Sequence, residues 1–166
     1  MLHHPLHRRL VQTVQVRHRR LPFRPPVATP PPQNLPQRPL AGLLAAFDWA
    51  GRQDPPVEAV VSVSTDTPFL PANLVARLNA HSDDGAAIAS SEGRIHPVVG
   101  LWPVALRPVL ETALSERRRS VEKFARLIEA VEVPFPHVTI GSRSVDPFFN
   151  ANTPGDLELA REILQS

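Results

Sequence analysis

The 166-residue sequence contains no cysteine, and its 18 basic residues include a single lysine, Lys123. The absence of cysteine excludes disulfides and thiolate metal sites. No apolar run approaches the roughly 18 residues that cross a bilayer. No apolar stretch of about 7–15 residues follows the basic start, as a secretory signal would require. We therefore expect a cytoplasmic protein without a membrane span, and the length suits one domain with a hydrophobic core.

Residues 1–38 contain no acidic residue and no glycine. They hold seven arginines, four histidines and eight prolines, whereas residues 39–166 hold 11 basic and 16 acidic residues. Prolines exclude a helix from the second half of this segment, and chain of this composition usually stays disordered. We therefore divide the protein into an Arg/Pro/His-rich segment, 1–38, with one candidate strand at Leu10–Val16, and a domain, 39–166.

Helical and strand patterns alternate along residues 39–166. Apolar residues at helical spacing predict helices, and clusters of β-branched residues predict strands. The predicted helices are Leu40–Trp49, Ala72–Ala80, Pro103–Ser115, Val121–Ala130 and one that opens at Thr153–Asp156. The predicted strands are Val57–Ser64, Gly85–Ser90, Ile95–Trp102 and Glu132–Phe135. This order predicts an α/β, Rossmann-like three-layer sandwich, and the composition of Val57–Ser64 suits a strand buried on both faces of a parallel sheet.

Three clusters of residues could carry chemistry. Asp66 directly follows Val57–Ser64, and its carboxylate could hold Mg²⁺ together with phosphate oxygens or merely cap the turn. Asn150 and Asn152 precede a predicted helix N-terminus, where their amides could bind a polar ligand or form the turn. His96 belongs to the third cluster, and a lone histidine before proline is more often structural. None of these clusters decides the function by itself.

Five motifs in a fixed order carry a resemblance to a known family. They are PLAG at 39–42, DTPFLP at 66–71, GRIHPVVGLWP at 93–103, RRSVEKF at 118–124 and DPFFNANTPGDL at 146–157. In the order and spacing of these motifs, residues 39–166 resemble the bacterial molybdenum cofactor guanylyltransferases. DTP followed by FLP occurs in several sugar-phosphate and cofactor nucleotidyltransferases. FFNANTP together with GRIHPVVGLWP is considerably more specific.

The resemblance implies a nucleotidyltransferase that moves GMP from GTP to molybdenum-molybdopterin and releases pyrophosphate. It implies Mg²⁺ as cofactor, and molybdoenzymes or their chaperones as protein partners. The residues it assigns are, for the nucleotide, Leu40, Ala41, Gly42 and Asp66; for Mg²⁺ and catalysis, Asp66; and for the molybdopterin substrate, Asn150 and Asn152.

One part of the family pattern has no counterpart in this sequence. The family begins with a strand and a loop of the form LAGGxSxRMGxDK, whose backbone N–H groups and lysine hold the GTP phosphates. Residues 1–38 contain nothing like it, and Arg38 stands where the family usually has glycine. We therefore expect weak or absent GTP binding and impaired catalysis by this chain.

The same departure affects the predicted sheet. Without the family's first strand, the edge of Val57–Ser64 would be open and prone to pairing, so Leu10–Val16 or another subunit would have to cover it. The composition of residues 1–38 is also typical of a GC-rich gene read out of frame, and we interpret the segment in that way.

Two other functions stay open at this point. The chain could be a related cytidylyl- or sugar-phosphate nucleotidyltransferase, because the base-selecting residues of the family have no counterpart here. It could instead be a non-catalytic remnant that uses the basic segment 1–38 as an interaction arm. Nucleic acid is not expected as a partner, since only Phe23 interleaves the arginines with an aromatic ring.

Overall fold

The computed structural model describes residues 11–16, 39–82 and 85–165. Its central sheet has five strands in the order β1-β2-β4-β3-β5. These strands are β1 (Val11–Val16), β2 (Ala59–Ser64), β3 (Ala87–Ser91), β4 (Arg94–Pro103) and β5 (Val131–Pro134). β4 is antiparallel to both β2 and β3, and β5 is parallel to β3, so β2, β3 and β5 run in one direction. The carboxyl ends of these three strands therefore lie at the same edge of the sheet.

The sheet is mixed rather than parallel around β2, and this corrects one expectation from the sequence. Both neighbours of β2 are antiparallel to it. Five of its six residues are nevertheless buried, because helices cover both faces of the sheet. The β-branched composition of β2 thus indicated burial on both faces correctly, but it could not specify the direction of the neighbouring strands.

β1 covers the edge of β2 for which the sequence required a partner. Its six residues pair antiparallel with β2, from Val11 opposite Ser64 to Val16 opposite Ala59. The predicted strand and its covering role are both confirmed. The disorder and the out-of-frame origin predicted for residues 1–38 concern residues that otherwise lie outside the described part of the chain.

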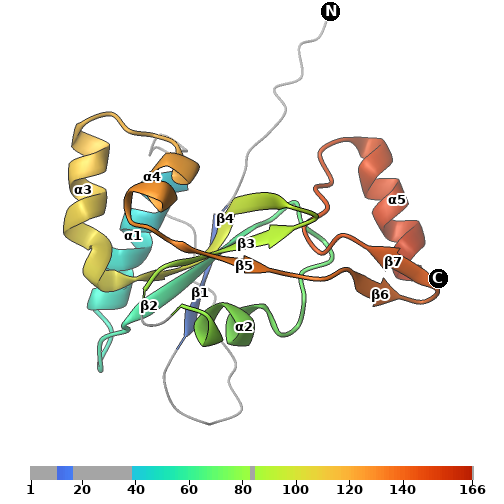
Figure 1. Cartoon of the computed structure of the whole chain (residues 1–166), viewed down its shortest axis with the longest axis horizontal. Helices are drawn as coiled ribbons and strands as arrows, with labels where there is room; N and C mark the ends of the chain where they lie inside the picture. The colour runs from blue at the N-terminus through green and yellow to red at the C-terminus, as the bar shows by residue number, and fades with distance from the viewer. Residues whose placement is uncertain (1–10, 17–38, 83–84, 166) are drawn as a thin grey trace, which may run out of the picture.

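Helices lie on both sides of the sheet, which gives three layers (Figure 1). They are α1 (Pro39–Gly51), α2 (Leu74–Ala80), α3 (Arg107–Ser115) and α4 (Val121–Leu127), with a 3₁₀ turn at Val104–Leu106. A fifth helix, α5 (Pro154–Gln165), lies beyond the end of the sheet. α1, α3 and α4 contribute to one hydrophobic cluster with Val60 and Trp102 of the sheet, whereas α2 packs against Val61 and Leu101 on the other face. No helix in the described part of the chain has the length and apolarity to cross a bilayer.

Local signals explain where several helices begin and end. Ser120 caps α4, since its hydroxyl accepts a hydrogen bond from the Lys123 N–H at 3.3 Å. α4 ends at Leu127, three residues earlier than its apolar pattern predicts, because Glu129 adopts a left-handed conformation (φ 54°) and the Ala130 N–H bonds back to the Ala125 carbonyl. The cap was readable from the sequence, but a left-handed glutamate was not.

A small hairpin that the sequence did not predict lies beside the sheet. It consists of β6 (Val138–Ile140) and β7 (Arg143–Val145), which pair antiparallel. Figure 1 shows it next to α5, away from α1 and α3. Phe69 from the loop after β2 packs in one cluster with Val145 of the hairpin and Ile163 of α5. This cluster connects the C-terminal elements to the carboxyl edge of the sheet.

Candidate functional site

Asp66 lies in the turn that follows β2, and its own loop orients the carboxylate. The Ser64 hydroxyl donates a hydrogen bond to Asp66 Oδ1, and the Thr67 hydroxyl donates to the Ser64 carbonyl at 2.7 Å. Asp66 is half-buried, and none of the ion pairs among the described residues involves it. The carboxylate is therefore oriented by one hydroxyl group and has no ion-pair partner among the described residues.

The loop that carries the two asparagines lies directly against the Asp66 turn. The Ala151 N–H donates a hydrogen bond to the Asp66 carbonyl at 2.8 Å, although 85 positions separate the two residues in the sequence. Asn150 and Asn152 flank Ala151, and both are half-buried. Neither side-chain amide is hydrogen-bonded to another described residue. The structure thus brings together Asp66, Asn150 and Asn152, with the amide groups free for a polar ligand.

The start of α5 fixes the far end of this asparagine loop. The Thr153 hydroxyl accepts a hydrogen bond from the Asp156 N–H at 3.1 Å, and Asp156 Oδ2 accepts from the Thr153 N–H at 2.8 Å and the Asn152 N–H at 3.1 Å. These reciprocal bonds form the capping box that the sequence predicts, with Pro154 as the first residue of α5. The bonds from the N–H groups hold the pKa of Asp156 below its usual value.

The near end of the loop is fixed by a pair of residues that the sequence did not single out. Ser91 Oγ lies 2.8 Å from His96 Nε2 and donates to Asp146 Oδ1 at 2.8 Å. Asp146 Oδ1 also accepts from the Phe148 N–H at 2.9 Å. Asp146 belongs to the DPFFNANTP motif, so a signal for it existed. No sequence signal pointed to Ser91, because its hydrogen bond to Asp146 joins residues 55 positions apart in the sequence.

His96 is held in its neutral form at neutral pH. Partial burial lowers its pKa; the Asp146 carboxylate opposes this shift, and the Arg94 guanidinium adds to it. Its ring packs on Phe148 with the centroids 4.7 Å apart. The order of the hydrogen bonds, histidine to serine to aspartate, differs from a nucleophilic triad, in which the histidine takes the serine proton and the aspartate orients the histidine. This cluster therefore does not activate Ser91 as a nucleophile.

Three of the four residues assigned to the nucleotide lie at the start of α1. Leu40 is fully buried and lines a small apolar recess together with Ser62 of β2 and Val98 of β4. Ala41 and Gly42 are half-buried, and a Cβ added at Gly42 would have no atom within 4 Å. The Leu40 side chain therefore serves the core, whereas the surface of this helix start is formed by small residues that leave the backbone accessible.

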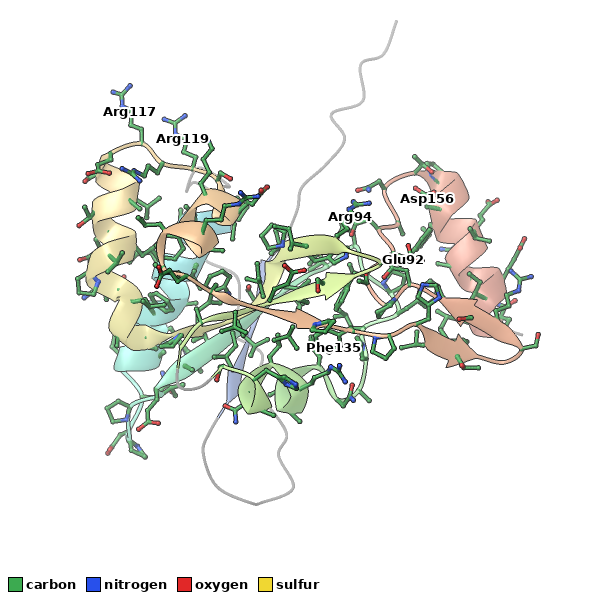
Figure 2. All side chains as sticks on the ribbon, in the orientation of Figure 1. Glu92, Arg94, Arg117, Arg119, Phe135 and Asp156 are labelled. Carbon is green, nitrogen blue, oxygen red and sulfur yellow. The ribbon has the colours of Figure 1, made fainter. Side chains whose placement is uncertain are left out.

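Charged side chains occupy different ends of the molecule. Figure 2 shows Glu92 and Arg94 at the β3–β4 turn, on the side of α5, whereas Arg117 and Arg119 project from the loop between α3 and α4 on the opposite side. Arg94 lies close enough to His96 to lower its pKa. Arg94 thus places positive charge beside His96.

A metal at this site would depend mainly on one side chain. Within residues 39–82 and 85–165, no group of three or more His, Asp or Glu residues is arranged to hold a metal ion. Asp66 offers a single, oriented carboxylate. This donor suits Mg²⁺, which is commonly held by one or two carboxylates while phosphate oxygens and waters complete its octahedron.

Comparison with known proteins identifies the family. The model of the MobA-like NTP transferase domain matches residues 7–132, about three-quarters of the chain. The chain belongs to this family. Two curated relatives are the molybdenum cofactor guanylyltransferases of Bradyrhizobium sp. (strain ORS 278), 46% identical over 129 residues, and of Rhizobium leguminosarum bv. trifolii, 46% identical over 131 residues. The matches cover 75% and 77% of this chain, and the chain spans 58% and 62% of these relatives' lengths.

Solved structures agree with the MobA-like fold. A molybdopterin-guanine dinucleotide biosynthesis protein A from Archaeoglobus fulgidus matches with a TM-score of 0.55 and 23% identity, over 76% of this chain and 62% of its own. A putative protein from Aquifex aeolicus matches with a TM-score of 0.57 and 19% identity, over 72% and 58%. The Rossmann-like three-layer sandwich expected from the sequence is confirmed.

Proposed function

We propose that this chain carries the substrate-binding edge of a molybdenum cofactor guanylyltransferase, which transfers GMP from GTP to molybdenum-molybdopterin and releases pyrophosphate. The observation that carries the proposal is the 2.8 Å hydrogen bond from the Ala151 N–H to the Asp66 carbonyl. It holds the carboxylate turn and the asparagine loop side by side, as a reaction between two phosphate-bearing substrates requires. The names of the curated relatives support the same reaction.

Each side of the site has a separate task in this proposal. Asp66 would hold Mg²⁺, and the Ser64 hydroxyl, which donates to Asp66 Oδ1, would orient the carboxylate for it. The metal would neutralise charge on the transferring phosphoryl group. Asn150 and Asn152 would donate from their amide groups to the molybdopterin substrate and orient its terminal phosphate. Catalysis of this kind rests on positioning and charge stabilisation more than on covalent help from the protein.

The nucleotide side is the weaker part of the site. Small residues at the start of α1 let the backbone of Ala41 and Gly42 approach the nucleotide. Residues 1–38 contain no glycine and no lysine, so nothing in them matches the phosphate-binding loop of the family. We therefore propose that this chain binds Mg-GTP more weakly than micromolar and transfers GMP slowly. Calorimetry of the full chain with Mg-GTP measures this directly.

The transferase activity is tested with a chimera. Residues 1–38 are replaced by the corresponding N-terminal segment of the Bradyrhizobium relative, and transfer from GTP and from CTP is compared by the yield of each dinucleotide. We expect GMP transfer that requires Mg²⁺ and the carboxylate of Asp66. Preferential CMP transfer would favour the cytidylyltransferase alternative, and transfer that survives Asp66→Asn undiminished would refute the role given to Asp66.

A further inference from the structure

We infer that Ser91, His96 and Asp146 are positioning residues that hold the asparagine loop in its binding geometry. The inference deepens the proposed function, on which it rests for the identity of the substrate. In this inference, none of the three side chains contacts the substrate. They act through the backbone of residues 146–151, which carries Asn150 to its place beside the Asp66 turn.

The first support is an unbroken chain of hydrogen bonds that ends on the loop backbone. Ser91 is buried, with 3% of its surface exposed, and its hydroxyl joins His96 Nε2 to Asp146 Oδ1, both at 2.8 Å. The same Asp146 oxygen accepts from the Phe148 N–H at 2.9 Å, and the Phe149 N–H donates to the Asp146 carbonyl at 3.1 Å. The turn that starts the loop is therefore tied to the end of β3.

The direction of the protons follows from the number available. A serine hydroxyl has one proton, and Ser91 donates it to Asp146, so His96 must donate its Nε2–H to Ser91 Oγ. Nε2 carries a proton in this neutral tautomer and also in the imidazolium form. The chain of bonds thus persists when His96 titrates, and its role is geometric rather than that of a proton donor to substrate.

The second support is the packing of two consecutive phenylalanines in different directions. Phe148 lies between His96, at a centroid distance of 4.7 Å, and Phe135, at 5.3 Å in an edge-to-face arrangement. Phe149 packs instead on Phe69 of the Asp66 turn, at 5.8 Å. Rotation or sliding of the loop would break one of these packings, so the backbone just before Asn150 is held from both sides.

Amide hydrogen exchange of the full chain tests the inference without any substrate. In Ser91→Ala, both bonds of the hydroxyl are lost, and we expect the Phe148 and Ala151 amides to exchange about five- to tenfold faster than the global change in stability accounts for. The matched control is Ser62→Ala. Ser62 is also buried on the sheet and makes two hydrogen bonds, to the Val98 carbonyl at 2.6 Å and from Trp102 Nε1 at 2.8 Å.

Ser62→Ala should lower global stability without a selective effect on the loop. If Ser91→Ala leaves the Phe148 and Ala151 amides as protected as Ser62→Ala does, the inference is overturned. This result would not depend on which substrate the protein binds, so it separates failure of the inference from failure of the proposed function.

Conservative replacement of His96 provides the second readout. Glutamine can present an amide N–H close to the position of Nε2, so His96→Gln should keep loop protection, whereas His96→Ala should lose it. His96→Ala should also weaken binding of molybdenum-molybdopterin about tenfold while leaving Mg-GTP binding unchanged. Equal behaviour of the two variants in amide exchange would contradict the positioning role. If the loop amides exchange faster in His96→Ala but binding of molybdenum-molybdopterin does not change, the assignment of Asn150 and Asn152 to this substrate is wrong.

Discussion

Asp66 is oriented by the Ser64 hydroxyl at the end of β2 and not by a positively charged partner. Ser64 donates to its Oδ1, and no described Arg, Lys or His forms an ion pair with it. A carboxylate held in this way has a fixed direction but keeps its charge for a ligand. This distinguishes Asp66 from Asp48, which forms an ion pair with Arg107 at 2.7 Å.

Substitution of Asp66 should remove catalysis while preserving the fold. The side-chain oxygen of asparagine can still accept from Ser64, but the charge that we propose to hold Mg²⁺ is lost. We expect GMP transfer by Asp66→Asn in the chimera to fall at least about a hundredfold, with an unchanged midpoint of urea unfolding. Asp48→Asn is the matched control and should retain full transfer. A similar loss of transfer in both variants would contradict a specific role for Asp66.

His96 should make the protein less stable in mild acid. Its pKa is lowered in the folded state, by burial first and by Arg94 in addition, so the unfolded chain binds a proton more readily. The free energy of unfolding should therefore fall as pH decreases through about 6.5, the ordinary histidine value. Urea unfolding at pH 7.5 and 5.5 should show a smaller decrease for His96→Gln than for the wild type. An identical decrease in the wild type and in His96→Gln would show that groups other than His96 cause the pH dependence.

At the scale of elements, the β3–β4 hairpin supplies the Ser91 and His96 side chains that lead to Asp146. Its two-residue turn has positive φ at Glu92 (51°) and Gly93 (73°), as a tight antiparallel hairpin requires. The pairing then jumps from Ala89 opposite His96 to Ile88 opposite Gly100, so residues 97–99 bulge from β4. Pro97 lacks the N–H for regular pairing and lies in this bulge. The regular pairing on the turn side of the bulge sets His96 opposite Ala89, two positions before Ser91 on the same face of the sheet.

In this hairpin the backbone of Gly100 lies close to neighbouring atoms, and substitution of this glycine tests that packing. A Cβ on Gly100 would lie 2.7 Å from the Ala87 carbonyl oxygen and 2.9 Å from the Trp102 ring. We expect Gly100→Ala to lower the free energy of unfolding by about 1–3 kcal/mol. Gly42→Ala, in open space on α1, should be neutral or stabilising by up to about 1 kcal/mol. Urea unfolding compares the two, and equal effects would refute this account of β4.

Most helices and strands of residues 39–166 were predictable from local patterns, but their ends and the smallest elements were not. The Leu40–Trp49 prediction falls within α1, whose last residue is Gly51. The helix predicted from Pro103 begins only at Arg107, because β4 continues to Pro103 and a 3₁₀ turn follows. β6 and β7 have three residues each, too few for alternation to show.

At the scale of the whole molecule, the candidate site is assembled by tertiary contacts that the sequence does not display. Motif order indicated Asp66, Asn150 and Asn152 through resemblance, whereas their types and spacing alone favoured turns and caps. The bond that joins the Asp66 turn to Ala151 and the bond from Ser91 to Asp146 depend on how the sheet and the C-terminal loop pack. The sequence could therefore indicate three candidate site residues, but not that Ser91, His96 and Asp146 are hydrogen-bonded to one another beside them.

The edge of the sheet is a second property of the whole molecule. β1 supplies the antiparallel partner along all six residues of β2. Val14→Pro removes a backbone donor opposite Val61 and should expose this edge, so we expect self-association in sedimentation velocity at concentrations where the wild type does not associate. Val27→Pro, outside the described residues, is the control. A monomeric Val14→Pro variant with wild-type stability would show that β1 is dispensable.

Calorimetric titration of the full chain with molybdenum-molybdopterin tests the central claim most directly, because that claim places a substrate site where the Asp66 turn meets the asparagine loop. The account predicts binding that the Asn150→Ala, Asn152→Ala double variant weakens at least about tenfold, through the loss of hydrogen bonds from two amide groups. Unchanged affinity in the double variant, or no binding by the wild-type chain, would contradict it.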